Sequence, residues 1–179
     1  MDHFESVICT LLEGEGYWVR RSYKVEVTKD EKRRIGTPSM PRPEIDVVAL
    51  HFAKNEVLAF EAKSFLDSPG VRLSSLQEKY ERPQGGYKLF TSDRYREIVF
   101  VALKRNLVAR GMANADTRIL LGLAAGKVYQ GQSGPVRELL ERRGWLFWSP
   151  EDIKRKVIAL AERGYENDVA TITAKILRN

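Results

Sequence analysis

The sequence has one cysteine, two histidines and no long apolar run, and each of these shortages excludes a class of protein. The lone thiol of Cys9 rules out an internal disulfide framework and an all-cysteine metal site, which indicates a reducing, intracellular location. His3 and His51 are too few and too scattered for a zinc site or a catalytic triad. No apolar stretch approaches the roughly 20 residues that cross a bilayer, and the N-terminus carries acids where a signal peptide carries positive charge. We therefore expect a soluble cytoplasmic protein without a membrane partner.

The composition is that of a folded globular chain. Its 179 residues fit one domain, and the proportions of 43% hydrophobic and 30% charged residues argue against global disorder. Thirty Lys and Arg against 24 Asp and Glu give a formal charge of +6, which weakly favours a polyanionic partner. No fixed-period repeat or low-complexity tract is present. We expect a core over residues 1–148 and a helical extension of the same domain over residues 149–179.

In the first third of the chain, apolar spacing predicts a helix, a strand and a hairpin. An amphipathic helix is expected over residues 2–13 and a strand over residues 17–27. Residues 28–43 combine a charge run with three prolines and a glycine, which predicts a long mobile loop. Two apolar runs, 44–52 and 56–62, then predict a largely buried hairpin whose turn uses Asn55 in a left-handed conformation.

The rest of the chain alternates helical and strand patterns. A Ser75-x-x-Glu78 capping box predicts a short helix to Glu81, and Ser149 and Asn167 are expected to cap the last two helices. Residues 97–103 fit a strand as well as the long helix expected around them. The remaining expected elements are a helix from about Asp93 to Arg110 ended by Gly111, one or two strands over 118–130, a helix over 135–144 and a strand over 145–148. The order predicts an α/β fold with a mixed central sheet flanked by helices and a C-terminal helical extension.

Three charged residues fall within the apolar strands of the predicted hairpin. Alternate strand residues share a face, so Asp46 lies with Glu44, and Glu61 lies with Lys63. One face of the hairpin can therefore hold two acids and an ammonium group. A buried carboxylate requires a counter-charge, and two acids facing one lysine leave a negative pocket suited to a hard cation such as Mg²⁺.

These residue types suit metal-assisted phosphodiester hydrolysis. Asp46 and Glu61 would hold Mg²⁺, the backbone carbonyl of Ala62 would add a ligand, and a bound water would become a better nucleophile. Lys63 would orient or help deprotonate that water, or stabilise charge on the phosphate oxygens. A structural alternative stays open, in which Glu61 and Lys63 simply pair at a strand end and backbone donors satisfy Asp46.

The pattern of Asp46 followed fifteen residues later by Glu61-Ala62-Lys63, on two hairpin strands after a helix bearing Glu5, resembles the PD-(D/E)XK nuclease superfamily. That superfamily includes Holliday-junction resolvases and has a restriction-endonuclease-like fold. The resemblance covers about the first ninety residues. It implies an Mg²⁺-dependent endonuclease that cleaves DNA, with Mn²⁺ able to substitute. It also implies that Asp46 and Glu61 bind the metal and that Lys63 is catalytic.

The resemblance extends to residues outside the hairpin. A glutamate on the first helix often completes the family's site, which implies a metal role for Glu5, although Asp2-x-x-Glu5 is equally a capping box. The proline of the family's name precedes Glu44 here, so Glu44 is a further candidate for the metal role. Many relatives also have a glutamine on the helix after the lysine. Gln77 and Gln84 both qualify, and Gln77 has the clearer helix around it.

Basic and aromatic residues suggest how a nucleic acid and a second subunit would bind. The residues expected to track phosphates are Arg20, Arg21, Lys24, Lys32, Arg33 and Arg34, although a solvated surface explains them almost as well. Cutting two strands needs two sites, which favours a homodimer, and Trp145, Phe147 and Trp148 are expected in the core or in its interface. The alternative function is a non-catalytic nucleic-acid-binding or interaction protein that retains the nuclease fold.

Overall fold

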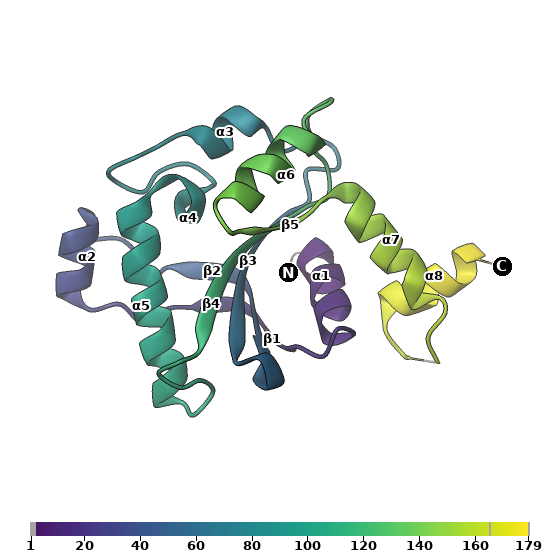
Figure 1. Cartoon of the computed structure of the whole chain (residues 1–179), viewed down its shortest axis with the longest axis horizontal. Helices are drawn as coiled ribbons and strands as arrows, with labels where there is room; N and C mark the ends of the chain where they lie inside the picture. The colour runs from purple at the N-terminus through teal and green to yellow at the C-terminus, as the bar shows by residue number, and fades with distance from the viewer. Residues whose placement is uncertain (1–2, 165, 179) are drawn as a thin grey trace.

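Within residues 3–164 and 166–178, which the computed structural model describes, five strands form one open sheet with helices on both faces (Figure 1). The strands lie in chain order: β1 (Trp18–Lys24), β2 (Glu44–His51), β3 (Glu56–Lys63), β4 (Arg118–Ala125) and β5 (Leu146–Trp148). β1, β2 and β3 pair antiparallel, whereas β3, β4 and β5 pair parallel. The expected α/β class with a mixed, helix-flanked sheet is therefore confirmed.

Alternation along the central strands divides the core into two layers, one on each face of the sheet. Val48 and Ala59 pack in one hydrophobic cluster, and their strand neighbours Val47 and Phe60 pack in the other. The first cluster is covered by α2 (Lys29–Ile35), α3 (Leu73–Gln77), α4 (Lys88–Thr91), α5 (Asp93–Ala109) and α6 (Ser133–Arg142). The second is covered by α1 (His3–Glu13), α7 (Pro150–Leu160) and α8 (Val169–Arg178).

The hairpin between β2 and β3 forms as the sequence predicts. Residues Phe52–Lys54 make a single 3₁₀ turn, η1, and Asn55 follows it with a φ of 49°. This left-handed conformation is one that asparagine tolerates better than most residues. The register pairs Val48 with Ala59, so the even-numbered residues of β2 share a face with the odd-numbered residues of β3. This register places Asp46 and Glu61 on the face covered by α5.

The predicted mobile loop over residues 28–43 is wrong in its first half, where α2 forms. Thr28 and Glu31 make a reciprocal capping box, in which the Glu31 amide donates to Thr28 Oγ1 and the Thr28 amide donates to the Glu31 carboxylate. Gly36 then ends the helix with a φ of 86°. The three prolines all lie after this point, so they leave the helix intact. Residues 37–43 remain as a connector that leads into β2.

Two other predicted caps are wrong. The Ser75 capping box does not form, because α3 begins at Leu73, whose amide donates to the side chain of Gln132 at 2.8 Å. Asp168, not Asn167, caps α8 by accepting hydrogen bonds from two amides of its first turn. Asp2, the first residue of the expected N-terminal capping box, lies outside the described residues.

The two ambiguous stretches adopt single, regular elements. Residues 97–103 lie inside α5, which ends near Gly111 as expected, and residues 118–130 contribute one strand, β4. The sequence around 97–103 is apolar enough for a strand, but its buried residues follow the helical repeat of α5. The helix α4 had no counterpart among the expected elements.

The aromatic residues near β5 are core residues. Phe147 is buried in the first cluster, and Trp148 packs edge-on against Phe60 with ring centroids 5.2 Å apart. Trp145 packs against Phe90 at 5.4 Å in the first cluster. These contacts bear out the core interpretation of the three aromatics.

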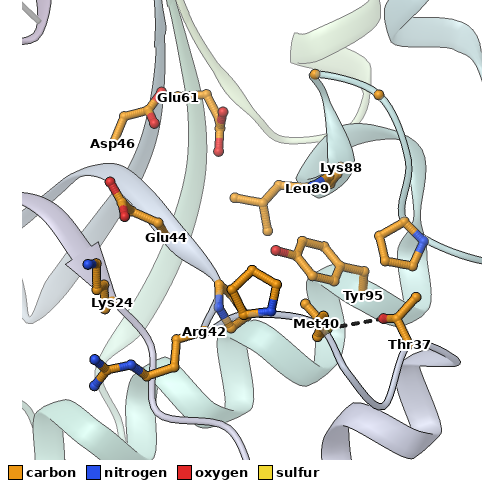
Figure 2. A pocket seen from close by; sticks show the side chains of 15 residues that line it. Lys24, Thr37, Met40, Arg42, Glu44, Asp46, Glu61, Lys88, Leu89 and Tyr95 are labelled. Atoms are coloured by element: carbon orange, nitrogen blue, oxygen red, sulfur yellow. Dashed lines mark hydrogen bonds between the residues drawn. The ribbon is translucent and has the colours of Figure 1, made fainter.

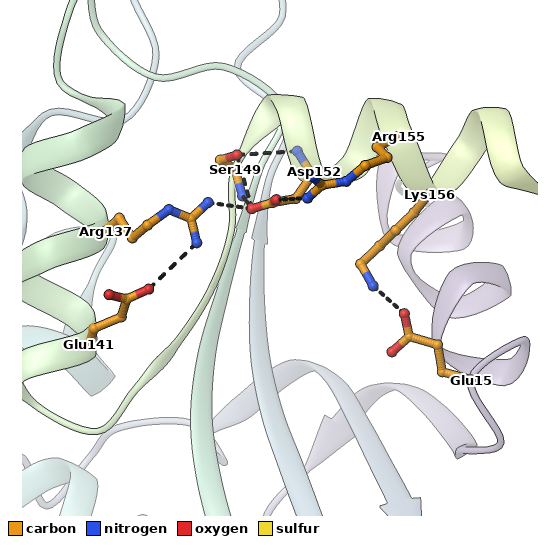
Figure 3. A network of polar contacts seen from close by, with 7 residues as sticks. All are labelled: Glu15, Arg137, Glu141, Ser149, Asp152, Arg155 and Lys156. Atoms are coloured by element: carbon orange, nitrogen blue, oxygen red, sulfur yellow. Dashed lines mark hydrogen bonds and ion pairs between the residues drawn. The ribbon is translucent and has the colours of Figure 1, made fainter.

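The helix α7 is anchored to the domain by a polar network at its start (Figure 3). Ser149 caps it as predicted, since the Asp152 amide donates to Ser149 Oγ at 3.2 Å. Arg137 of α6 donates to Asp152 Oδ2 at 2.5 Å, and Lys156 pairs with Glu15 in the turn after α1. The C-terminal segment therefore packs on the same core as the rest of the chain.

A second polar contact ties α2 to α5. Glu31 is buried and accepts hydrogen bonds from Arg105 at 2.5 and 3.0 Å. The hydrogen bond from Arg105 is the main reason that the pKa of Glu31 is lowered from 4.5 to about 2. The ionised carboxylate thus stabilises the folded state, and this contribution is lost as the pH falls from the unfolded-state pKa towards the folded-state value.

We expect Glu31→Gln to lower the free energy of unfolding by about 1–2 kcal/mol at neutral pH, because a charged hydrogen bond is lost at a partly exposed site. The difference from wild type should shrink as the pH falls through the window between 4.5 and about 2. Urea unfolding at a series of pH values measures it. Asp30→Asn, an exposed neighbour on α2, is the control, and a difference independent of pH would contradict the assignment.

Candidate functional site

The two acids and the lysine of the hairpin meet at one point. Lys63 Nζ donates to Asp46 Oδ2 at 3.3 Å and to Glu61 Oε2 at 3.0 Å. The two carboxylates therefore share the Lys63 ammonium group as their counter-charge. The side chains are 21%, 12% and 20% exposed for Asp46, Glu61 and Lys63, so the cluster is recessed but open to solvent. The convergence expected from strand alternation is therefore confirmed.

Near the acids, β3 stays paired with β4 on one side and separates from β2 on the other. The pairing of β2 with β3 ends at Val47 and Phe60, whereas β3 pairs with β4 as far as Lys63. Beyond the last β2 pair, the Ala62 amide donates to Asp46 Oδ2 at 2.9 Å. The N–H and C=O of one strand residue point to the same side, so the Ala62 carbonyl faces the same gap. A second backbone group thus joins the site.

Burial and the attraction between Glu61 and Lys63 act in opposite directions on the pKa values of these two residues. Burial raises the pKa of Glu61, Lys63 opposes the rise, and the neighbouring Asp46 charge adds to it. Burial also acts to lower the pKa of Lys63, but the charges and hydrogen bonds of Glu61 and Asp46 outweigh it and raise that pKa above its ordinary value. Lys63 is therefore a firmly protonated ammonium group, which suits charge stabilisation better than proton abstraction.

A pocket of about 770 Å³ opens beside the acids. Figure 2 shows Asp46 and Glu61 at one end of it, Glu44 beneath them, and Tyr95 and Lys88 on the opposite side. Its walls come from the connector at residues 37–43 and from the segment at residues 83–88. The size is that of a typical small-ligand pocket, which spans roughly 300–1,000 Å³. Glu44 thus faces the same space as the two acids, as alternation predicts.

The other side chains predicted for catalysis do not line the pocket of the acids. Glu5 is on α1, where its charge adds to the effect of burial in raising the pKa of Cys9. Within the described residues, no group of three or more Asp, Glu, His or Cys side chains is arranged to hold a metal ion. The metal role of Glu5 therefore stays a prediction. Gln77 and Gln84 are exposed, and neither lines the pocket.

The six basic residues expected to bind phosphates do not form a single surface. Lys24 lines the pocket of the acids, whereas Arg21 donates to Ser6 at 2.7 Å in a separate recess beside α1. Lys32 donates to the Met40 carbonyl at 2.7 Å, which holds the connector. Arg33 pairs with Asp30 and lies with Arg34 in a third recess, and Arg20 is an exposed residue of β1. Of the six, Lys24 is the one placed beside the acids.

Sequence reasoning missed several residues of the pocket, among them Arg42, Lys88 and Tyr95. Tyr95 belongs to the apolar repeat of α5, and Lys88 follows a glycine pair in a stretch without periodicity. Burial, together with the charge of Glu61, raises the pKa of Tyr95 to about 12. No local signal relates these residues to β3, because tertiary packing alone brings them there.

Comparison of the chain with protein-family models, with curated proteins and with solved structures found no match. Within the described part of the chain, none of the helices has the length and apolar character needed to cross a membrane. The functional argument therefore depends on the geometry of the pocket.

We expect Lys63→Met to destabilise the protein by about 1–3 kcal/mol at about pH 8, because two facing carboxylates lose their counter-charge at a partly exposed site. Without the lysine, the pKa of Glu61 rises further, because the ammonium charge that opposes the effect of burial is gone, so protonation on acidification should restore part of the lost stability. Urea unfolding at about pH 8 and about pH 5 measures this recovery. Lys154→Met, on exposed α7 surface, is the control, and an equal loss at both pH values would refute the coupling.

Proposed function

We propose that this protein is a Mg²⁺-dependent nuclease that hydrolyses DNA phosphodiester bonds through a PD-(D/E)XK-type site. The observation that supports the proposal most is the meeting of Asp46, Glu61 and Lys63 across β2 and β3. A helix, a hairpin bearing the acids and then further helices and strands follow in the order that the resemblance implies. The mixed sheet is compatible with a restriction-endonuclease-like fold.

The donor set fits magnesium. The carboxylates of Asp46 and Glu61 and the carbonyl of Ala62 are all oxygen donors, and water and phosphate oxygens can complete six-fold coordination. Zinc sites, in contrast, favour nitrogen and sulfur donors. When bound, the metal would lower the pKa of a coordinated water and offset negative charge on the phosphate.

The protein's own groups have separate tasks in this scheme. The Ala62 amide fixes the orientation of Asp46, and the pairing of β3 with β4 fixes Glu61. Lys63, as a protonated ammonium group, would orient the attacking water or stabilise charge that develops on the phosphate. The recess keeps these groups partly desolvated, which strengthens their electrostatic effect.

A second candidate function is a non-catalytic DNA-binding or interaction protein with the same fold. It is favoured by the contacts of Lys63, which neutralise much of the acidic charge without a metal. A homodimer, which would supply two sites for two strands, is a prediction that goes with the nuclease.

We expect the wild-type protein to nick supercoiled plasmid in Mg²⁺ or Mn²⁺. Asp46→Ala and Lys63→Ala should each slow cleavage by about a hundredfold or more, because each removes a group that acts on the reacting phosphate or its metal. Gel assays of nicking measure the rates, with Lys154→Ala as the control. A parallel panel of duplex, single-stranded, flap, junction and RNA substrates identifies the preferred nucleic acid.

Salt-sensitive DNA binding without cleavage in either metal would support the non-catalytic protein instead. Cleavage that is equally fast in wild type and in Asp46→Ala would exclude this site as its source. Correct folding of each variant is checked by its urea unfolding curve.

The third acidic ligand can be identified by metal binding alone. We expect Glu44→Gln to weaken Mn²⁺ binding by about tenfold, because Glu44 lines the pocket with Asp46 and Glu61. Glu5→Gln should weaken it less, since α1 packs on the other face of the sheet. Calorimetric titration measures both affinities, and a larger effect of Glu5→Gln would give the metal role to the α1 glutamate.

A further inference from the structure

Lys63 is already engaged by the acids, which limits what it can do for a substrate. Its Nζ contacts Asp46 at 3.3 Å and Glu61 at 3.0 Å. An ammonium group has three donors, so two of them are directed to carboxylates. A phosphodiester entering the pocket carries its own negative charge and meets three acidic side chains there: Asp46, Glu61 and Glu44. A positive group on the opposite side of the pocket would offset the resulting repulsion.

Lys88 is placed to provide that charge. It is the first residue of α4, it is exposed, and it lines the same pocket as Asp46 and Glu61 (Figure 2). Its charge is close enough to oppose the rise in the pKa of Glu61. Among the ion pairs of the described residues, which engage Lys63, Arg42 and many others, none involves Lys88. The amine is thus available to a ligand.

The segment before Lys88 carries little side-chain bulk. Gly85 and Gly86 line the pocket, and a Cβ added at either glycine would meet no atom within 4 Å. The pocket is therefore open beside these two glycines, close in sequence to Lys88.

Tyr95 provides a neutral donor beside Lys88. Its ring is 5% exposed and is held in the first cluster, while Figure 2 shows its hydroxyl directed into the pocket. A tyrosine phenol, with an ordinary pKa of about 10, is protonated at neutral pH, so it can donate to an anion. The position of the ring is fixed by α5, which makes this donor pre-oriented.

We propose that Lys88 and Tyr95 form a phosphate-binding wall that contacts the phosphate of the strand bound at Asp46 and Glu61, from the side opposite these acids. The ligand class is a nucleic-acid phosphodiester, so the inference rests on the proposed nuclease function. Lys88 would contribute charge and Tyr95 a directed hydrogen bond. Both would contact the substrate directly from the lining of the pocket, whereas Gln77 and Gln84 do not line it.

The test compares Lys88→Ala, Lys88→Arg and Tyr95→Phe with the matched control Lys154→Ala, which removes an exposed lysine from α7 on the other face of the sheet. DNA binding is measured in Ca²⁺ over a series of salt concentrations, and cleavage is measured in Mg²⁺. Lys88→Ala should reduce the slope of log affinity against log salt by about one, because one phosphate contact is lost. Lys88→Arg should restore the slope.

For cleavage, Lys88→Ala should lower kcat/KM by about tenfold or more, and Tyr95→Phe should lower kcat with little change in salt dependence. If Lys88→Ala leaves DNA affinity, its salt dependence and kcat/KM unchanged, the proposed phosphate-binding wall is wrong. If wild type binds DNA but does not cleave it, the nuclease proposal fails, and the binding series still decides whether Lys88 contacts phosphate. An equal change of salt slope in Lys154→Ala would also count against a specific contact.

Discussion

The candidate site depends on the point where β2 and β3 separate. Strand pairing stops at Val47 and Phe60, and the next amide of β3 that faces β2 binds a carboxylate instead of a carbonyl. If β2 and β3 stayed paired beyond this point, the Ala62 amide would donate to a carbonyl of β2. Asp46 would then lose this backbone donor, and the Ala62 carbonyl would also bind the neighbouring strand. The separation thus creates both the anchor for the acid and the gap that the Ala62 carbonyl faces.

The electrostatics of the site follow from this geometry. Two recessed carboxylates on the neighbouring strands β2 and β3 are costly without a counter-charge, and Lys63 supplies one from the same strand as Glu61. Lys63 therefore offsets part of the acidic charge, and the group of Asp46, Glu61 and Lys63 by itself keeps one negative charge in excess when all three are ionised.

Local sequence signals predicted the hairpin, Asn55 and the Ser149 cap, because each depends on neighbours in the chain. The capping-box pattern, in contrast, gave two wrong results. Thr28-x-x-Glu31 forms a capping box and was overlooked, whereas Ser75-x-x-Glu78 was expected and does not form, since Gln132 caps α3 at Leu73. The alternation of side chains along the two strands was enough to predict that Asp46, Glu61 and Lys63 share one face of the hairpin. Lys88 and Tyr95 escaped prediction because they reach the pocket through the packing of α4 and α5.

The acids and part of the remaining pocket lining lie on different kinds of structure. Asp46 and Glu61 lie on central strands, while the residues of the 37–43 connector lie on an irregular segment at the rim of the pocket and Lys88 begins the short helix α4. Substitutions or insertions at the rim alter shape and charge without disturbing the sheet. Such a division means that a change in the rim can alter which ligands the pocket admits and leave the position of the acids unchanged, so ligand preference is the property most open to evolutionary change here.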